Sequence, residues 1–311
     1  MSSRKVIIFG PTGAVGSAAA RTAEELGAKV VLAMRNTEKP IPGIDPEREK
    51  QGSFQRVHAD LSKPDTVHDA VNKTGARYAF IYYGRGTPDN MKSTIEALKS
   101  AGIELVVFLS SFTVQGDLTA IQPSEIIPYI HAQVEINLGE IFGSDGFVAV
   151  RPGSFASNTV QYKAGLESGK VKIYMPDAKV DCIVPDDIGR VCGTILAKGP
   201  QDEQRAIYLF GPKLLSQADS VRILAKLLGK NCEIETADEE DAYKMFVEEL
   251  GVPAPVAKYM MKQLGKTSPK GGCVFGYLVN EEDLSNVQKY SGKRATTFEE
   301  WVEKNNQIFV S

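Results

Sequence analysis

Three glycines near the start of the chain have the types and spacing of a nucleotide-binding turn. They are Gly10, Gly13 and Gly16, between the apolar run 6–9 and a helical pattern over 18–26. The apolar run predicts a strand buried on both faces. In a strand–turn–helix context, Gly10 allows the tight turn, Gly13 lets backbone approach a pyrophosphate, and Gly16 lets the helix pack on the strand. The alternative is an ordinary glycine-rich connection between a strand and a helix.

The end of the second predicted strand indicates which dinucleotide binds. An acid there accepts hydrogen bonds from a ribose hydroxyl and favours NAD. This chain instead has Arg35 after the strand at 29–34, with Lys39 nearby. A guanidinium suits bidentate contact with the 2′-phosphate of NADP. We therefore expect NADP, and the alternative for Arg35 is a solvated surface arginine.

Further cofactor contacts are expected where later strands end. Asp60 and Leu61 follow the third predicted strand and are placed to touch the adenine ring, although Asp60 also suits a helix N-cap. Tyr83 ends the fourth strand beside the cofactor path, where packing is an equal alternative. The full set of expected cofactor contacts is Gly10, Thr12, Gly13, Ala14, Val15, Gly16, Arg35, Asp60, Leu61, Tyr83, Pro152 and Phe155.

Composition excludes several classes of protein. The chain has 311 residues, 42% of them apolar, and a formal net charge of −3, so no basic footprint favours nucleic acid or an anionic membrane. Its apolar runs are too short to span a bilayer, and the first strand leaves no room for a signal peptide. Four scattered cysteines have no metal-type spacing. We expect a cytoplasmic protein with reduced thiols and no metal site.

The elements that position these residues alternate as strand and helix. Residues 1–151 predict an α/β fold of the Rossmann type, a doubly wound parallel sheet that binds NADP at its carboxyl edge. After residue 151 the pattern loosens, and 152–311 predict a smaller, helix-rich substrate cap. Part of 180–210 is expected to return to the sheet. Other expectations are a surface loop over 36–52, a helix over 130–142 after a loop with Pro128, and strands over 147–150, 171–175, 180–184 and 206–210.

Several motifs together resemble the NmrA-like family, a branch of the atypical short-chain dehydrogenases/reductases. They are the glycine turn, Arg35, Asp60-Leu61, the segment 151–155 with Asn158, and residues 186–189. The resemblance runs over nearly the whole chain and is of a fungal type. It implies a Rossmann fold, NADP as cofactor, and a role in secondary metabolism.

The resemblance also implies a catalytic helix, from which this sequence departs. Typical short-chain reductases place a Tyr and a Lys four residues apart, and the Tyr donates the proton. One register puts Tyr129 and Gln133 at those positions, so the Lys is lost. A second register, which matches Val134-Glu135 to the family pattern, puts His131 in the lysine's place. Candidate catalytic residues are therefore His131, Tyr129 and Ser111, with Ser110 as a further group that could orient a carbonyl.

Two functions from different classes remain open. The first is an NADPH-dependent reductase, or a related isomerase, that acts on a small apolar secondary metabolite as a monomer or homodimer. The second is a regulator that senses NADP without turnover and passes its state to a protein partner. The incomplete Tyr-Lys pair favours the regulator. A substantial helical cap and the loops over 112–127, 155–162 and 266–277 favour an enclosed pocket and hence the enzyme.

Overall fold

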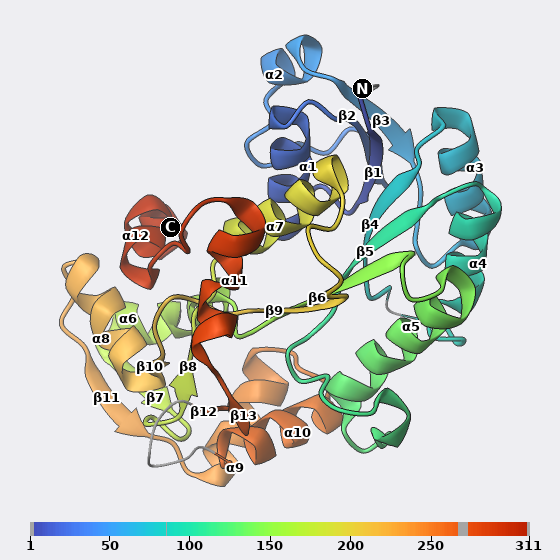
Figure 1. The fold of residues 1–311 in the computed structure, drawn as a ribbon. Helices are drawn as coiled ribbons and strands as arrows, with labels where there is room; N and C mark the ends of the chain where they lie inside the picture. Colours follow the sequence, from blue (N-terminus) through green and yellow to red (C-terminus); the bar gives the residue numbers. More distant parts are fainter. Residues whose placement is uncertain (1–2, 85, 267–272, 310–311) are drawn as a thin grey trace.

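Seven parallel strands form the central sheet of the protein in the computed structural model, which describes residues 3–84, 86–266 and 273–309 (Figure 1). Their spatial order is β3-β2-β1-β4-β5-β6-β9, so the order in which successive strands are added reverses between β1 and β4, although all of them run parallel. The predicted doubly wound Rossmann-type fold is confirmed. The strands are β1 (Lys5–Phe9), β2 (Lys29–Met34), β3 (Phe54–His58), β4 (Tyr78–Tyr82), β5 (Leu105–Leu109), β6 (Phe147–Pro152) and β9 (Ala206–Leu209).

Helices cover both faces of this sheet, which explains why inner strands such as β1 and β5 are apolar without alternation. Ile8 lies in the same buried cluster as Ala19 on one face, whereas its neighbour Ile7 lies in the cluster with Val71 on the other. The first face is covered by α1 (Ala14–Glu25), α7 (Pro185–Lys198) and α11 (Glu281–Ser291). The second is covered by α3 (Pro64–Thr74), α4 (Lys92–Ser100) and α5 (Ile126–Phe142).

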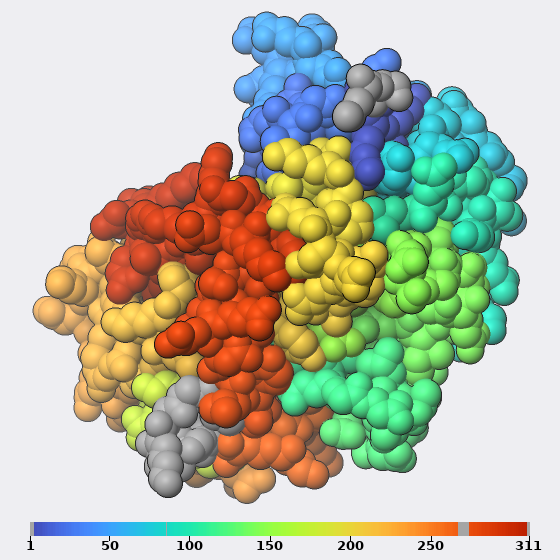
Figure 2. Space-filling view, viewed as in Figure 1, coloured from blue at the N-terminus to red at the C-terminus, as the bar shows by residue number. Residues whose placement is uncertain are grey.

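Most of the chain after β6 packs around two further apolar clusters beside the carboxyl edge of the sheet. It contains paired short strands, with β7 parallel to β11, β8 antiparallel to β10, and β12 antiparallel to β13. In Figure 2 the red C-terminal residues lie directly against the yellow α7. The elements are η2 (Ala156–Tyr162), α6 (Lys163–Ser168), β7 (Lys170–Ile173), β8 (Lys179–Val180), β10 (Leu215–Ser216), α8 (Gln217–Leu227), β11 (Glu233–Thr236), α9 (Glu239–Lys244), the π-turn η3 (Met245–Glu249), α10 (Ala254–Leu264), β12 (Cys273–Val274), β13 (Tyr277–Leu278), α12 (Phe298–Lys304) and η4 (Asn306–Phe309).

The chain crosses between these two parts more than once, because β9 returns to pair with β6. The division into domains at residue 151 stays a prediction. Among the described residues, no helix combines the length and apolar character that crossing a bilayer requires.

Several predicted elements have different bounds in the structure. The helix expected over 130–142 begins at Ile126, with Pro128 inside its first turn. A proline costs little there because the first N–H groups of a helix have no intrahelical partner. The loop expected over 36–52 contains α2 (Pro46–Gln51), which Asp45 caps by accepting a hydrogen bond from the Arg48 N–H. The strand expected over 180–184 is reduced to β8, and α11 was not predicted.

The close packing of α7 on α1 depends on two glycines that sequence analysis did not single out for it. A Cβ atom built on Gly189 would lie 2.5 Å from the Val15 carbonyl oxygen, and one on Gly193 would lie 2.5 Å from the Ala19 carbonyl oxygen. These oxygens belong to the backbone of a helix, so they cannot rotate away as a side chain can. The two helices therefore approach at a distance that only glycine permits.

We expect Gly193→Ala to destabilise the protein, although glycine-to-alanine changes in helices usually stabilise by up to about 1 kcal/mol. The added methyl group forces α1 and α7 apart, which costs roughly 1–3 kcal/mol. Urea unfolding followed by circular dichroism measures the effect, with Lys198→Ala near the end of the same helix as the control. An unchanged or raised midpoint for Gly193→Ala would contradict the close packing.

Candidate active site

The glycine turn leaves an open cradle at the amino end of α1. Gly10 has a φ of +69°, a left-handed conformation that favours glycine. A Cβ on Gly16 would lie 2.4 Å from the Gly10 carbonyl oxygen, whereas one on Gly13 would meet only that oxygen, at 3.5 Å. Gly13 is the N-cap of α1, and no side chain caps its first turn. The exposed N–H groups are therefore available to an anion such as a pyrophosphate.

Arg35 and Asp60 lie near each other at the ends of β2 and β3. Arg35 is exposed, and Leu61 is buried beside them. Partial burial alone would raise the pKa of Asp60, but hydrogen bonds from Ser62 and the charge of Arg35 lower it. The loop after Arg35 is held by Arg56, whose guanidinium donates to the Lys39 carbonyl at 2.8 Å and to Glu49. The structure thus presents an exposed cation at the strand end where the 2′-phosphate of NADP is expected.

His131 lies on α5 against the ends of β4 and β5. Its ring centroid is 6.0 Å from that of Tyr83 and 6.1 Å from that of Phe108. Its Nδ1 lies 2.8 Å from the Ile127 carbonyl oxygen, which can only accept, so Nδ1 carries the proton. Burial lowers the pKa of His131, and this hydrogen bond and the charge of Glu135 only partly offset it. The ring is therefore neutral at pH 7, with Nε2 as a hydrogen-bond acceptor.

Tyr129 lies on a different face of the same helix. Two residues along an α-helix correspond to a rotation of about 200°, so Tyr129 and His131 point in nearly opposite directions. Tyr129 is half-buried, and Gln133 follows it one turn later. The structure does not bring Tyr129 and His131 together, so they cannot both face the edge of the sheet. Their catalytic roles stay a prediction.

A buried ion pair between Glu135 and Arg151 lies beneath this region. Glu135 of α5 is 3% exposed, and Arg151 of β6 is 6% exposed. The Arg151 Nε donates to Glu135 Oε1 at 3.0 Å, and Arg151 Nη1 donates to the Tyr208 hydroxyl and to the Val114 carbonyl. Burial alone would lower the pKa of Arg151, but its bonds to Glu135 raise it. Sequence analysis named both residues within family motifs but did not predict that they pair.

The two candidate serines differ in how their hydroxyl groups are used. Ser110 is buried, and its Oγ donates to Glu135 Oε1 at 2.5 Å, so it supports the ion pair rather than a substrate. Ser111 is half-buried; its Oγ lies 2.8 Å from the Thr113 hydroxyl, with either group as donor, and accepts from the Thr113 N–H at 3.3 Å. Ser111 therefore keeps one hydrogen-bonding position that a ligand can use.

Asp181 is a buried carboxylate that sequence analysis missed. Its oxygens accept hydrogen bonds from the N–H groups of Ser154, at 2.7 Å, and Gly211, at 3.1 Å. Burial raises the pKa of Asp181 to about 7, although these N–H groups lower it in part. A Cβ on Gly153 would lie 2.4 Å from Asp181 Oδ1. The carboxyl group therefore fixes the segment after β6, where cofactor contacts at Pro152 and Phe155 are expected.

A largely apolar cavity of about 270 Å³ adjoins this segment. Its walls come from η2, η3 and α10, among other elements, and they include Phe155. Of its lining residues, Phe155 was expected to contact the cofactor. The loops over 155–162 and 266–277 were expected beside an enclosed pocket; residues of the first and Phe275 of the second line this cavity, and 267–272 lie outside the described residues. The lining residues are Ser154, Phe155, Asn158, Thr159, Gln161, Tyr162, Val180, Cys182, Gln217, Ser220, Phe246, Leu250, Val252, Met260, Leu264 and Phe275.

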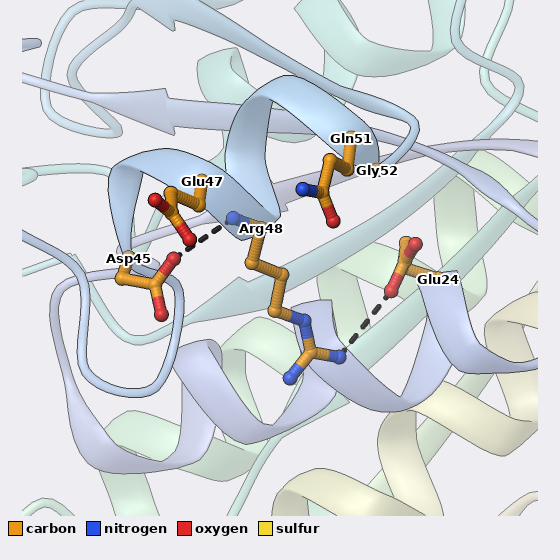
Figure 3. A pocket seen from close by; sticks show the side chains of 6 residues that line it. All are labelled: Glu24, Asp45, Glu47, Arg48, Gln51 and Gly52. Carbon is orange, nitrogen blue, oxygen red and sulfur yellow. Dashed lines mark hydrogen bonds and ion pairs between the residues drawn. The ribbon is translucent and has the colours of Figure 1, made fainter.

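A second hollow, between α1 and α2, is lined mostly by charged side chains (Figure 3). Its Arg48 is already paired with Glu24 at 3.3 Å and with Glu25 at 2.9 Å. It lies where α1 ends and β3 begins, and ligands of such sheets bind at the opposite, carboxyl edge. We therefore assign no function to it. In the part of the chain that the structure describes, no three His, Cys, Asp or Glu residues are grouped to hold a metal ion.

Comparisons with known proteins agree with this architecture. The model of the NmrA-like family matches residues 2–302. Nitrogen metabolite regulation-like protein bik4 from Gibberella fujikuroi is 37% identical, with 96% of each chain covered. Festuclavine dehydrogenase easG from Aspergillus fumigatus is 24% identical, over 81% of this chain and 84% of that protein. The NADPH complex of the quinone oxidoreductase QOR2 from Escherichia coli superposes with a TM-score of 0.72 at 18% identity, covering 97% and 99% of the two chains.

The buried Asp181 predicts an unusual dependence of stability on pH. Its pKa is about 7 in the folded protein against 3.8 normally, so the folded state holds the proton more tightly than the unfolded chain. The contribution of Asp181 to the free energy of unfolding therefore falls as the pH rises from about 4 to about 7 and is constant above that. Since one pKa unit corresponds to about 1.4 kcal/mol, the free energy of unfolding should fall by on the order of 4 kcal/mol over this range.

Asp181→Asn replaces the titratable carboxyl group with an amide, so it should flatten the decline in the free energy of unfolding between pH 4 and pH 7. Urea unfolding at a series of pH values measures it, and the exposed Asp177→Asn serves as the matched control. If both variants kept the same slope as the unmodified protein, Asp181 would not be the group that titrates.

Proposed function

Because the chain belongs to the NmrA-like family, we propose that it is an NADPH-dependent reductase, or a related isomerase, of a small secondary metabolite. One observation carries the proposal: a free helix N-terminus, an exposed arginine and an apolar cavity adjoin the same edge of the sheet. The first two suit the pyrophosphate and 2′-phosphate of NADP, and the third suits a substrate.

The described residues fit NADP at several points. The open space at Gly13 and the uncapped first turn of α1 accommodate a pyrophosphate. Arg35 has no hydrogen-bonded or ion-paired partner among the described residues, and its guanidinium is therefore available to a phosphate group. The QOR2 structure, crystallised with NADPH, shares the fold and supports this choice of cofactor. When bound, NADPH supplies a hydride to the substrate.

His131 would orient the cofactor rather than donate a proton. Its Nδ1 proton is held by the Ile127 carbonyl oxygen, and burial keeps the ring neutral. The Nε2 atom can then accept a hydrogen bond, for example from a ribose hydroxyl of the nicotinamide half. Ser111, with a hydroxyl shared with Thr113, is the candidate for a further polar contact with the cofactor or the substrate. Tyr129 could donate a proton only if its side of α5 faced the substrate.

The second candidate function is a regulator that binds NADP without turnover. The relative named as a nitrogen metabolite regulation-like protein, at 37% identity, favours it, and so does the absence of a lysine four residues after Tyr129. Consumption of NADPH at 340 nm with a panel of quinones, enones and imines separates the two. The reductase requires turnover with at least one of them. Binding of NADPH without turnover on any would support the regulator.

We further propose that the protein acts in the cytoplasm, as a monomer or homodimer. Its net charge of −3 supports a small molecule rather than nucleic acid as its ligand. Size-exclusion chromatography with light scattering measures the oligomeric state.

Arg35→Ala should weaken NADPH binding by about ten- to a hundredfold and leave NADH binding nearly unchanged. A hydrogen bond to a charged group contributes on the order of 1.5–3 kcal/mol, and about 1.4 kcal/mol is a tenfold change in affinity. Isothermal titration calorimetry with both cofactors measures this, with Lys39→Ala as a control for a nearby cation. Equal affinity of the unmodified protein for NADPH and NADH would refute the role of Arg35.

His131→Ala should weaken NADPH binding roughly two- to tenfold, the range that one neutral hydrogen bond supplies. Tyr129→Phe, on the other side of the helix, should leave the affinity unchanged. The same calorimetry measures both variants. If His131→Ala instead left the affinity intact and abolished turnover, the residue would be a proton donor and not a positioning residue.

A further inference from the structure

The geometry points to an uncharged aromatic carbonyl compound as the ligand of the 270 Å³ cavity, with its carbonyl group at Ser154 and its ring among the aromatic side chains. The inference rests on the proposed reductase function and names its class of substrate.

The interior of the cavity favours a ring over an aliphatic or polar ligand. Phe155, Tyr162, Phe246 and Phe275 reach it from different segments of the chain. Aromatic rings attract one another beyond the area that they bury, in stacked or edge-to-face arrangements. At about 270 Å³ the cavity is near the lower end of the usual size for ligand pockets, so it suits one or two fused rings.

Most polar side chains in the wall are already satisfied within the protein. The Tyr162 hydroxyl donates to Gln217 Oε1 at 3.1 Å, and Gln217 Nε2 donates to the Tyr174 carbonyl at 2.8 Å. Thr159 and Ser220 donate to backbone carbonyls of η2 and α8. These groups have no donor left for a ligand, so a carbonyl oxygen placed against them would lose its hydration without gaining a hydrogen bond, which costs free energy.

Three polar side chains remain available to a ligand. Among the described residues, Ser154 Oγ and the side-chain amides of Asn158 and Gln161 have no hydrogen-bonded partner. Ser154 lies two residues after the end of β6, at the carboxyl edge of the sheet and next to Phe155, and its backbone N–H is held by Asp181. Asn158 is exposed and Gln161 half-buried, so they lie where the cavity meets solvent. The hydroxyl of Ser154 can donate to a carbonyl that faces the cofactor.

No charged side chain of the described residues lines this cavity. A carboxylate or sulfonate within it would lose its hydration without gaining an ion pair, which is strongly unfavourable. The cavity should therefore discriminate between neutral and charged ligands that have the same ring system.

We test this with 2-acetylnaphthalene and its charged analogue 6-acetyl-2-naphthoate, titrated into the protein saturated with NADP⁺ and followed by saturation-transfer-difference NMR. The neutral ketone should bind, and the carboxylate should bind at least tenfold more weakly. The substitution Val252→Trp fills the cavity and should weaken binding of the ketone at least tenfold. The matched control is Leu278→Trp, because Leu278 is 72% exposed and outside the cavity. Ser154→Ala should weaken binding of the ketone roughly two- to tenfold, because it removes one hydrogen bond.

Equal binding of the two ligands to the unmodified protein would overturn the inference, and this comparison needs no variant to fold. The inference would also be overturned if Val252→Trp bound the ketone as tightly as the unmodified protein does, provided that the NADP⁺ affinity and the circular dichroism of the variant are normal. Because the oxidised cofactor excludes turnover, failure here is distinct from failure of the reductase proposal. Binding of the ketone with no NADPH consumption on any substrate would refute the reductase and leave the ligand class intact.

Discussion

The buried ion pair between Glu135 and Arg151 is the interaction on which the carboxyl edge of the sheet depends. It joins α5 to β6, and hydrogen bonds from Ser110 to Glu135 and from Arg151 to Tyr208 extend it to the ends of β5 and β9. Such a pair adds little net stability compared with apolar packing, but removing one partner leaves a buried charge at a cost of about 3–5 kcal/mol. The pair therefore fixes one geometry of these four elements.

This geometry links the two halves of the proposed site. His131 lies one helical turn before Glu135, so the carboxylate that holds α5 also sets where the histidine ring meets Tyr83. Directly after Arg151 the chain runs through Pro152 to Phe155, which forms a wall of the cavity. The group that would orient the cofactor and the segment that would hold the substrate thus depend on the same pair of charges.

The sequence was sufficient for the features that lie within one short segment. The glycine turn and the alternation of strands and helices predicted the sheet, because each signal is local. The Glu135–Arg151 pair was not predicted, since its partners are brought together only when α5 packs across β5 and β6. The predicted start of α5 was wrong because proline is typical of loops, whereas Pro128 lies in the first turn of the helix, where its missing N–H costs little. An enclosed pocket was expected at loops that include 155–162, but its walls from η3 and α10 were not, because side chains such as Phe246 and Met260 have the pattern of ordinary core residues.

The most direct test of the account is a crystal structure with NADP⁺ and 2-acetylnaphthalene, a pair that cannot react. We expect the pyrophosphate at the amino end of α1, the 2′-phosphate at Arg35, and the nicotinamide between His131 and Phe155. The naphthalene ring should occupy the cavity, with its carbonyl oxygen at Ser154. A dinucleotide bound with its phosphates away from the glycine turn, or a ring bound outside the cavity, would contradict the account.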